Sequence, residues 1–142
     1  MEKLVPEMDV VIHPMAVSDF GFKHTNVKLK SNDPEAFIES LKERIYQTPK
    51  ILSHIKKWNP RCYLISFKFE NGLSNGDLLK IAYESLEKNN SDLVIANDKA
   101  QMKRFGSHIA YFVEKINGEM NYHLVNGKDK ISIEIFNKIK NI

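Results

Sequence analysis

The residues best suited to chemistry lie in the first quarter of this 142-residue chain. Asp19 follows the loop Met15-Ala16-Val17-Ser18, whose small side chains let the backbone approach a ligand, and its carboxylate could hold a metal ion or a ribose hydroxyl. Lys28 and Lys30 are two residues apart, so on a strand both ammonium groups point the same way and could converge on a polyphosphate. The same residues also fit a βα-type loop with one solvated carboxylate and a lysine-rich edge strand that protects against aggregation.

Three later positions carry a second set of candidates. Phe67 ends an apolar run and fits either a core aromatic or a ligand contact. Asn97-Asp98 follows another run and could contact a ligand or cap a turn. Lys88 closes a helical pattern, where a cation also complements the helix dipole.

Several familiar catalytic motifs are missing from the sequence. The five histidines have no metal-binding spacing, and there is no G-x-S-x-G, Walker or G-x-G-x-x-G motif. Cys62 is the only cysteine, which excludes an internal disulfide and a cysteine metal knuckle. It fits a small core residue better than a nucleophile.

Composition indicates an ordinary globular protein. Lys and Arg number 21 and Asp and Glu 18, so the net charge of +3 is too mild to indicate a nucleic-acid or membrane partner. No apolar run approaches the ~18 residues of a membrane span, and the first residues have no signal-peptide core. We therefore expect one domain over residues 1–142 and a cytoplasmic location.

The elements that must position these residues follow from the hydrophobic pattern. Continuous apolar runs at 9–13, 62–67 and 92–96 predict buried parallel strands. Helical patterns begin at Thr48-Pro49 and at Gly76-Asp77, and a third covers about 129–140. Asn117-Gly118 predicts a β-hairpin within 109–125, and residues 33–47 predict a short helix followed by a strand.

This order of elements predicts an α/β fold, a Rossmann-like three-layer sandwich. Its sheet should be mostly parallel, with a C-terminal β-hairpin and a terminal helix. Ligands of such sheets bind beyond the carboxyl ends of the parallel strands. The segments expected there are 13–20, 67–70 and 97–99.

Five segments resemble, in order, the motifs of one enzyme family. The segments are Asp9 to Phe20 (A-A-V-A-D-[FWY]), Val27 to Lys30 (K-I-K), Thr48 to Leu52 (T/N-P-D-I-L/V), Ile65 to Glu70 (G-F-A-x-E-T) and Lys88 to Asp98 (K-N-x-D-L-I-x-A-N-D). The family is the bacterial phosphopantothenate–cysteine ligase, or phosphopantothenoylcysteine synthetase, of coenzyme A biosynthesis. The resemblance extends from about Leu4 to Ile142.

The resemblance implies a nucleotide-driven ligation. In the family, CTP (ATP in eukaryotic relatives) activates the carboxylate of 4′-phosphopantothenate as an acyl-nucleotidyl ester and pyrophosphate leaves. The amine of cysteine then displaces the nucleotide. Mg²⁺ would accompany the triphosphate, since this hard cation prefers phosphate oxygens.

The resemblance also implies roles for individual residues. Lys28 matches the lysine that grips the triphosphate, which makes it the expected catalytic residue. The expected nucleotide-binding residues are His13, Pro14, Met15, Asp19, Lys28, Pro49, Lys50, Ile51, Leu52, Phe67 and Lys88.

Four positions depart from the family pattern. Met15 replaces the first alanine, and Ser66 replaces the glycine of G-F. Glu84 stands where many members carry a lysine, and Asn32 stands where a third basic residue would follow Lys30.

The family's amino-terminal half has no counterpart in this sequence. Members begin with a strand, a glycine-rich turn, a helix and a loop whose asparagine serves the second half-reaction. Three expectations follow: a partner polypeptide supplies this lobe, the chain is a fragment, or catalysis has been lost. The alternative functions are a non-catalytic nucleotide-binding or dimerisation module and a nucleic-acid-binding domain, which the mild charge disfavours. A homodimer is a further expectation.

Overall fold

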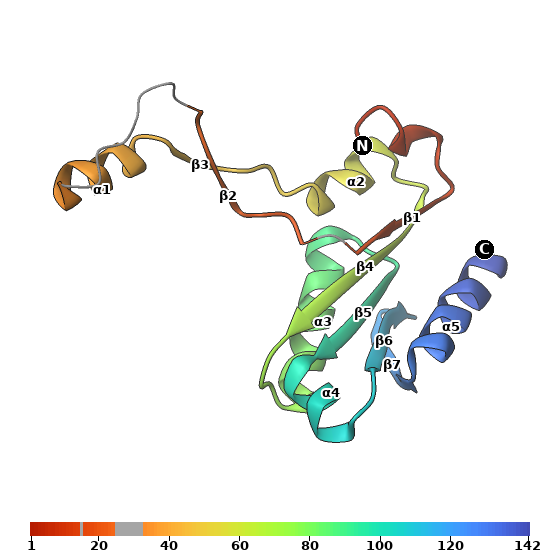
Figure 1. The fold of residues 1–142 in the computed structure, drawn as a ribbon. Coiled ribbons are helices and arrows are strands. Elements are labelled where there is room, and N and C mark those ends of the chain that lie inside the picture. The colour runs from red at the N-terminus through yellow and green to blue at the C-terminus, as the bar shows by residue number, and fades with distance from the viewer. Residues whose placement is uncertain (15, 25–32) are drawn as a thin grey trace. The chain divides into compact units, whose positions relative to one another are not determined.

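The computed structural model describes residues 1–14, 16–24 and 33–142. The chain forms two compact units (Figure 1). Unit 1 comprises Met1–Met15 and Leu52–Ile142, and unit 2 comprises Ala16–Ile51. The single domain over 1–142 stays a prediction.

Unit 1 is built on a mixed five-stranded sheet. Its strands, in spatial order, are β1 (Val10–His13), β4 (Tyr63–Glu70), β5 (Leu93–Asp98), β6 (Ile109–Ile116) and β7 (Glu119–Asn126). β1 pairs with β4 and β4 with β5 in parallel, whereas the β5–β6 and β6–β7 pairings are antiparallel. The prediction of neighbouring parallel strands from the three apolar runs is confirmed, and the whole sheet is mixed.

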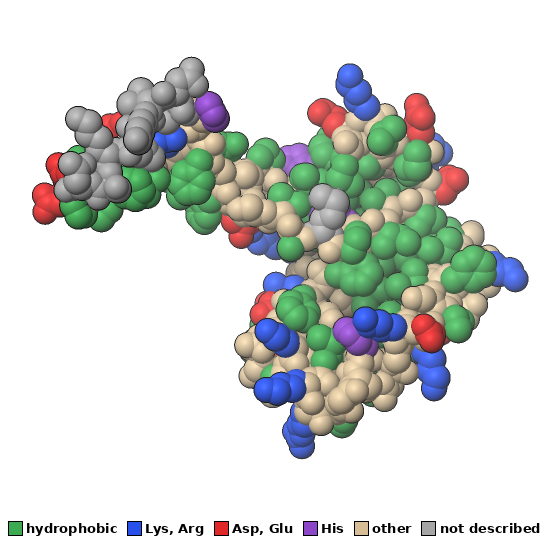
Figure 2. All heavy atoms as spheres, in the orientation of Figure 1, with side chains coloured by type: hydrophobic (Ala, Val, Ile, Leu, Met, Phe, Trp, Pro, Cys, Tyr) green, Lys and Arg blue, Asp and Glu red, His purple; other side chains and the backbone are tan. Residues whose placement is uncertain are grey.

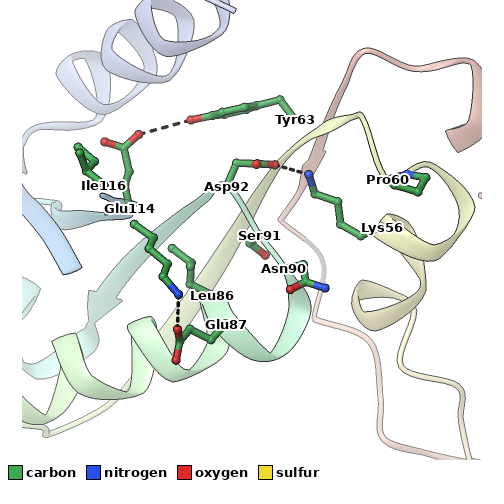
Figure 3. Close-up of a pocket in the computed structure, with 11 residues that line it drawn as sticks. Lys56, Pro60, Tyr63, Leu86, Glu87, Asn90, Ser91, Asp92, Glu114 and Ile116 are labelled. Atoms are coloured by element: carbon green, nitrogen blue, oxygen red, sulfur yellow. Dashed lines mark hydrogen bonds and ion pairs between the residues drawn. The ribbon is translucent and has the colours of Figure 1, made fainter. Parts of the chain in front are cut away.

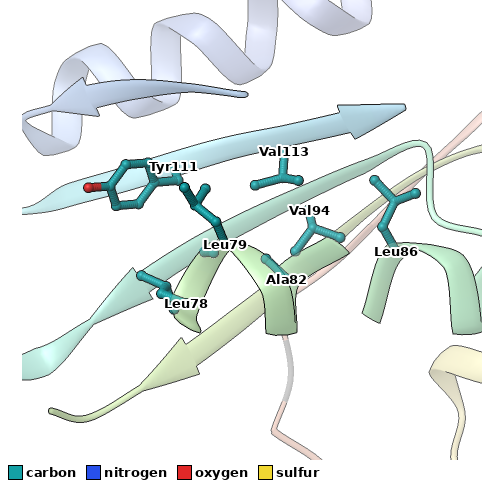
Figure 4. Close-up of a cluster of buried hydrophobic side chains, with 8 residues drawn as sticks. Leu78, Leu79, Ala82, Leu86, Val94, Tyr111 and Val113 are labelled. Atoms are coloured by element: carbon teal, nitrogen blue, oxygen red, sulfur yellow. The ribbon is translucent and has the colours of Figure 1, made fainter. Parts of the chain in front are cut away.

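Helices cover both faces of this sheet. The helical elements of unit 1 are a 3₁₀ turn η1 (Val5–Glu7), α2 (Leu52–Trp58), α3 (Asn75–Asn89), α4 (Lys99–Phe105) and α5 (Lys128–Lys140). On one face α3 packs Leu78, Ala82 and Leu86 against Val94 and Val113 (Figure 4). The predicted three-layer α/β fold with its hairpin and terminal helix is therefore confirmed.

The opposite face of the sheet is covered by α5. Ile131, Ile135 and Ile139 of this helix pack against a cluster that includes Ile95 and Phe112. Helix positions 131, 135 and 139 share one face because they are spaced by four residues. Figure 2 shows hydrophobic side chains gathered over β4 and β5 beside α5.

The N-terminus of α2 differs from the prediction. Thr48 and Pro49 were expected to open this helix, but it begins at Leu52. The Thr48 hydroxyl donates instead to the Ser18 carbonyl, and the Thr48 amide donates to the Asp19 carbonyl at 3.0 Å. Thr48 is thus occupied by a long-range pairing that the local pattern could not reveal.

The C-terminal hairpin forms as predicted. Asn117 has φ 53° and Gly118 has φ 86°, so both central residues of the two-residue turn adopt the positive φ of a type I′ turn. The β6–β7 ladder runs from the Ile116–Glu119 pair to the Ile109–Asn126 pair. Its strands are eight residues long.

Unit 2 contains a helix and a two-stranded antiparallel ribbon. α1 (Pro34–Lys42) precedes β3 (Ile45–Gln47), as predicted for residues 33–47, and β3 pairs with β2 (Phe20–Phe22). Asp33 caps α1 by accepting from the Ala36 amide at 3.0 Å. None of the described residues of unit 2 is buried.

Gly21 permits a close contact within this ribbon. It lies opposite Tyr46, and a Cβ atom at this position would stand 2.6 Å from the tyrosine Cζ. The absence of a side chain therefore lets the tyrosine ring lie over the strand.

Over the described ranges of both units, no helix is long and apolar enough to cross a membrane.

Candidate functional site

The carboxyl ends of β4 and β5 bring polar and aromatic groups together in unit 1. Phe69 lies opposite Asn97, and Glu70 lies opposite Asp98. Phe69 is 57% exposed, and the Lys68 ammonium contacts the Glu70 carboxylate at 2.9 Å. A cation, a carboxylate, an amide and an exposed ring are groups that can bind phosphate, hydroxyl and a planar base. This edge lies where the sheet type predicts a ligand.

Asp98 stabilises the backbone behind this edge. Its carboxylate is fully buried and accepts from the Leu73 amide at 3.1 Å and the Gln101 amide at 3.0 Å. Burial raises the pKa of Asp98, but these and neighbouring backbone amides outweigh it and leave the pKa lowered. Asp98 is therefore the N-cap of α4. Of the two roles expected for this residue, a ligand contact or a cap, the structure supports the cap.

His13 and Phe67 lie on the neighbouring strands β1 and β4, before the carboxyl end of β4. His13 ends β1 opposite Ser66, is 5% exposed, and its Nε2 has no hydrogen-bond partner in the part of the chain that the structure describes. Phe67 is half-buried and packs against the α5 cluster. Pro14 is exposed directly after β1.

The other expected nucleotide residues divide between the units. In unit 2, Asp19 and Lys50 face each other with Oδ1 and Nζ 3.9 Å apart, and both side chains are more than half exposed. Pro49 is exposed and Ile51 half-buried in the same unit, while Leu52 begins α2 in unit 1. Met15 and Lys28 lie outside the described residues.

Lys88 lies at the other end of the sheet. It is exposed near the C-terminus of α3, the helix that leads into the amino end of β5. The structure therefore does not bring Lys88 to the edge formed by Phe69 and Glu70. Its role in nucleotide binding stays a prediction.

A cavity of about 650 Å³ opens at this amino end of the sheet (Figure 3). Tyr63 and Asp92, at the starts of β4 and β5, face it together with residues from the ends of α3 and β6. The lining residues are Lys56, Pro60, Tyr63, Leu86, Glu87, Asn90, Ser91, Asp92, Glu114, Lys115 and Ile116.

The charged groups around this cavity are paired. Lys56 bonds Asp92 at 2.6 Å, and Lys115 bonds Glu87 at 2.8 Å. Burial raises the pKa of the Tyr63 phenol, and the nearby Glu114 and Asp92 carboxylates raise it further. Two lysines against three carboxylates in the lining give no excess positive charge for a polyphosphate.

A family model matches the whole chain. It is the model of the DNA/pantothenate metabolism flavoprotein C-terminal domain, and it matches residues 1–142. The chain belongs to this family. The family expected from the five sequence motifs is thereby confirmed, including its link to pantothenate metabolism and coenzyme A biosynthesis.

Curated relatives are bifunctional coenzyme A biosynthesis proteins named CoaBC. The protein of Thermococcus kodakarensis is 41% identical over 100 residues, which are 70% of this chain and 23% of the relative. The protein of Methanocaldococcus jannaschii is 30% identical over 99% of this chain and 33% of the relative. This chain thus spans about a quarter to a third of the length of these relatives.

Solved structures agree with this assignment. The DNA/pantothenate metabolism flavoprotein of Streptococcus pneumoniae is 34% identical, with a TM-score of 0.74 over 99% of this chain and 64% of that chain. A Cab2 variant in complex with phosphopantothenate-cysteine is 20% identical, with a TM-score of 0.52 over 69% of this chain and 32% of that chain. The latter likeness concerns the fold alone.

Sequence analysis missed the cavity at the amino ends of the strands. The polar run Lys88-Asn89-Asn90-Ser91-Asp92 was the available signal. Parallel sheets usually bind ligands at the carboxyl ends of their strands, so the strand pattern predicts a site there and not at the amino ends. Strand β4 also extends further than expected. Residues 67–70 were expected to follow the strand, but they form its last residues.

Proposed function

We propose that this chain carries the nucleotide-binding part of a phosphopantothenate–cysteine ligase. The reaction is CTP-dependent joining of 4′-phosphopantothenate to cysteine through an acyl-nucleotidyl intermediate. The whole-chain family match, together with five family motifs in register, is the observation that carries the proposal. By the family pattern, completion of the reaction also needs an amino-terminal lobe; the CoaBC relatives are three to four times as long as the matched region.

The residues proposed to act differ in their tasks. Lys28 holds the triphosphate and stabilises the charge that develops as pyrophosphate leaves. By the family pattern, Asp19 and the 49–52 turn bind the nucleoside, and the 13–15 segment and Phe67 contact the nucleotide. A contact of Lys88, which lies at the other end of the sheet of unit 1, stays a prediction. At the carboxyl edge of β4, Lys68 and Glu70 offer a further cation and acceptor.

The residues described fit a magnesium ion that arrives with the nucleotide. Mg²⁺ commonly takes one or two carboxylates together with phosphates and water. Among the described residues, no three or more His, Cys, Asp or Glu side chains form a metal-binding group. Asp19 of unit 2 is an exposed carboxylate that could contribute one such ligand. When bound, the ion would neutralise charge on the triphosphate.

Pyrophosphate release distinguishes the candidate functions. The chain is incubated with phosphopantothenate, CTP, Mg²⁺ and cysteine, alone and with an amino-terminal lobe from a CoaBC relative. Pyrophosphate that appears only with the added lobe supports the ligase. Saturable CTP binding without turnover in either mixture would instead indicate a nucleotide-binding module, and no CTP binding would contradict both.

Substitution of Lys28 locates the nucleotide site. Lys28→Ala should weaken CTP binding by ~1.5–3 kcal/mol, the range for a hydrogen bond to a charged group. Lys103→Ala removes an exposed lysine of α4 and should leave the affinity unchanged. Isothermal titration calorimetry measures both. Equal losses for the two variants would show that the phosphate site has been misplaced.

A further inference from the structure

Helix α4 concentrates positive charge at one end of unit 1. Residues 99–108 contain Lys99, Lys103 and Arg104 and no carboxylate, and the net charge of the whole chain is also +3, so the rest of the chain is neutral overall. All three cations are exposed. Figure 2 shows several Lys and Arg side chains around the end of unit 1 where Figure 1 places α4. A local excess of one sign raises the concentration of oppositely charged ligands at such a surface.

The position of Lys99 distinguishes it from the other two cations. It is the first residue of α4 and directly follows Asp98, the last residue of β5, so it lies at the carboxyl edge where a sheet of this type binds ligands. Side chains of a helix lean toward its N-terminus, so the Lys99 side chain starts in the direction of that edge. Lys103 lies about 6 Å further along the helix. Lys99 is also one residue beyond the Lys88–Asp98 segment that resembles a family motif, so that motif assigns it no role.

The carboxylates near this edge are already occupied. Glu70 pairs with the Lys68 ammonium at 2.9 Å. Asp98 is fully buried and accepts from two backbone amides, so its charge is directed into the protein. Lys99 itself forms no ion pair with any residue that the structure describes. Its charge therefore remains available to an anionic ligand.

The loop beside Lys99 leaves room for such a ligand. The Asp98 carboxylate accepts from the Leu73 amide at 3.1 Å, which holds the 71–73 loop next to the start of α4. Gly72 in this loop is exposed, and a Cβ atom there would meet nothing within 4 Å. Ala100, which follows Lys99, is a small exposed residue. The backbone around Lys99 is consequently open to the close approach of a phosphate group.

We propose that Lys99 binds the terminal phosphates of the nucleoside triphosphate and stabilises the pyrophosphate as it leaves. This inference rests on the proposed ligase function. In that reaction a carboxylate oxygen of the substrate bonds to the α-phosphorus, the bond from this phosphorus to the bridging oxygen breaks, and its electron pair leaves with the pyrophosphate. Negative charge grows on the leaving group, and an ammonium group in contact with it favours this step. Lysine suits the task because it binds phosphate as a compact point charge.

Binding of three ligands to the full chain tests this contact. CTP, inorganic pyrophosphate and CMP are titrated separately by isothermal titration calorimetry, with Mg²⁺ present and at one salt concentration. Lys99→Ala should weaken the binding of CTP and of pyrophosphate about tenfold, as expected for the loss of a charged hydrogen bond, and should leave CMP binding unchanged. Lys99→Arg keeps the charge and should restore most of the CTP affinity. Lys103→Ala is the matched control, because it removes the same charge one helical turn away and should change none of the three affinities.

The outcomes separate this inference from the proposed function. CTP binding that is equal in the wild type and Lys99→Ala would overturn the Lys99 contact and leave the ligase proposal standing. Equal losses in Lys99→Ala and Lys103→Ala would also overturn it, since they would indicate a diffuse basic surface, and tighter binding of a single-stranded oligonucleotide than of CTP would assign that surface to nucleic acid. A wild-type chain that binds neither CTP nor pyrophosphate would contradict both proposals. Melting temperatures check that the variants fold, and Lys99→Gln repeats the test if Lys99→Ala melts earlier than the wild type.

Discussion

Unit 1 and unit 2 hold their strands together in different ways. Unit 1 buries large side chains completely, among them Phe112, Leu64 and Ile55. In unit 2, Phe20 and Phe22 remain 56% and 57% exposed, and the ribbon depends on short backbone pairings. Two-stranded ribbons of this kind are at best marginally stable by themselves. Conformational stability should therefore reside in unit 1, while the exposed apolar groups of unit 2 remain available for contacts.

Removal of a phenylalanine from each unit tests this difference most strongly. Phe112→Ala should lower the free energy of unfolding by ~3–5 kcal/mol, because a fully buried ring leaves a cavity. Phe22→Ala should change it by only ~0.5 kcal/mol. Urea denaturation followed by circular dichroism measures both values. Similar losses in the two variants would show that unit 2 contributes to the cooperative core.

Two lysine–carboxylate pairs give a smaller contrast. Lys56 is 14% exposed and donates to both Asp92 and the Cys62 carbonyl at 2.6 Å, so Lys56→Met should cost ~1.5–3 kcal/mol. Lys42 pairs with Glu39 on exposed α1, where Lys42→Met should cost about 0.5 kcal/mol or less. Urea denaturation of both variants at low and at high salt measures the two losses in the free energy of unfolding and their dependence on salt. A loss for Lys56→Met that disappears in high salt would contradict a buried contact.

The smallest difference in stability is expected between variants of the two aspartate N-caps, Asp98 of α4 and Asp33 of α1. Asp98→Asn should lower the melting temperature of the protein, though by less than Lys56→Met, because the asparagine oxygen still accepts from a backbone amide. Asp33→Asn, at the exposed cap of α1, should lower it less again. Thermal denaturation of both variants measures the difference. A larger effect at Asp33 would reverse the expected order of the units.

The effect of Asp98→Asn should also depend on pH. The folded pKa of Asp98 lies below its ordinary value of ~3.9. Its stabilisation is therefore complete above that value and is lost as the pH falls through the folded pKa. The difference between wild type and Asp98→Asn should accordingly shrink in acid. A difference that grows as the pH falls would contradict a lowered pKa.

Much of unit 1 could be predicted from local sequence. The apolar runs at 9–13, 62–67 and 92–96 marked β1, β4 and β5 because strands buried on both faces are continuously hydrophobic. Asn117-Gly118 marked the hairpin through its positive φ values. The α4 helix was missed, since seven residues after Asp98 show little periodicity, and its cap depends on a buried carboxylate that also holds Leu73.

The candidate site was less predictable than the fold. Pairing of Phe69 with Asn97 follows from the register of β4 and β5, which no local pattern specifies. The cavity beside Tyr63 and Asp92 depends on where several separate elements begin or end. The family motifs could name residues such as Lys88 without showing that α3 carries this lysine to the far end of the sheet. The order of the motifs was therefore enough to predict the family. The geometry of the candidate site in unit 1 depends on tertiary pairing, which the motifs do not specify.

Unit 2 is inserted into the chain between two parts of unit 1. The polypeptide leaves after β1, forms residues 16–51, and returns at Leu52 before β4 pairs with β1. Doubling the length of such an excursion costs only about 0.6 kcal/mol in closure entropy. Variation in the length of the insert is thus thermodynamically cheap for the sheet. Away from Asp19, Lys28 and the 49–52 turn, the insert can therefore lengthen or shorten while the Val10–Tyr63 register stays in place.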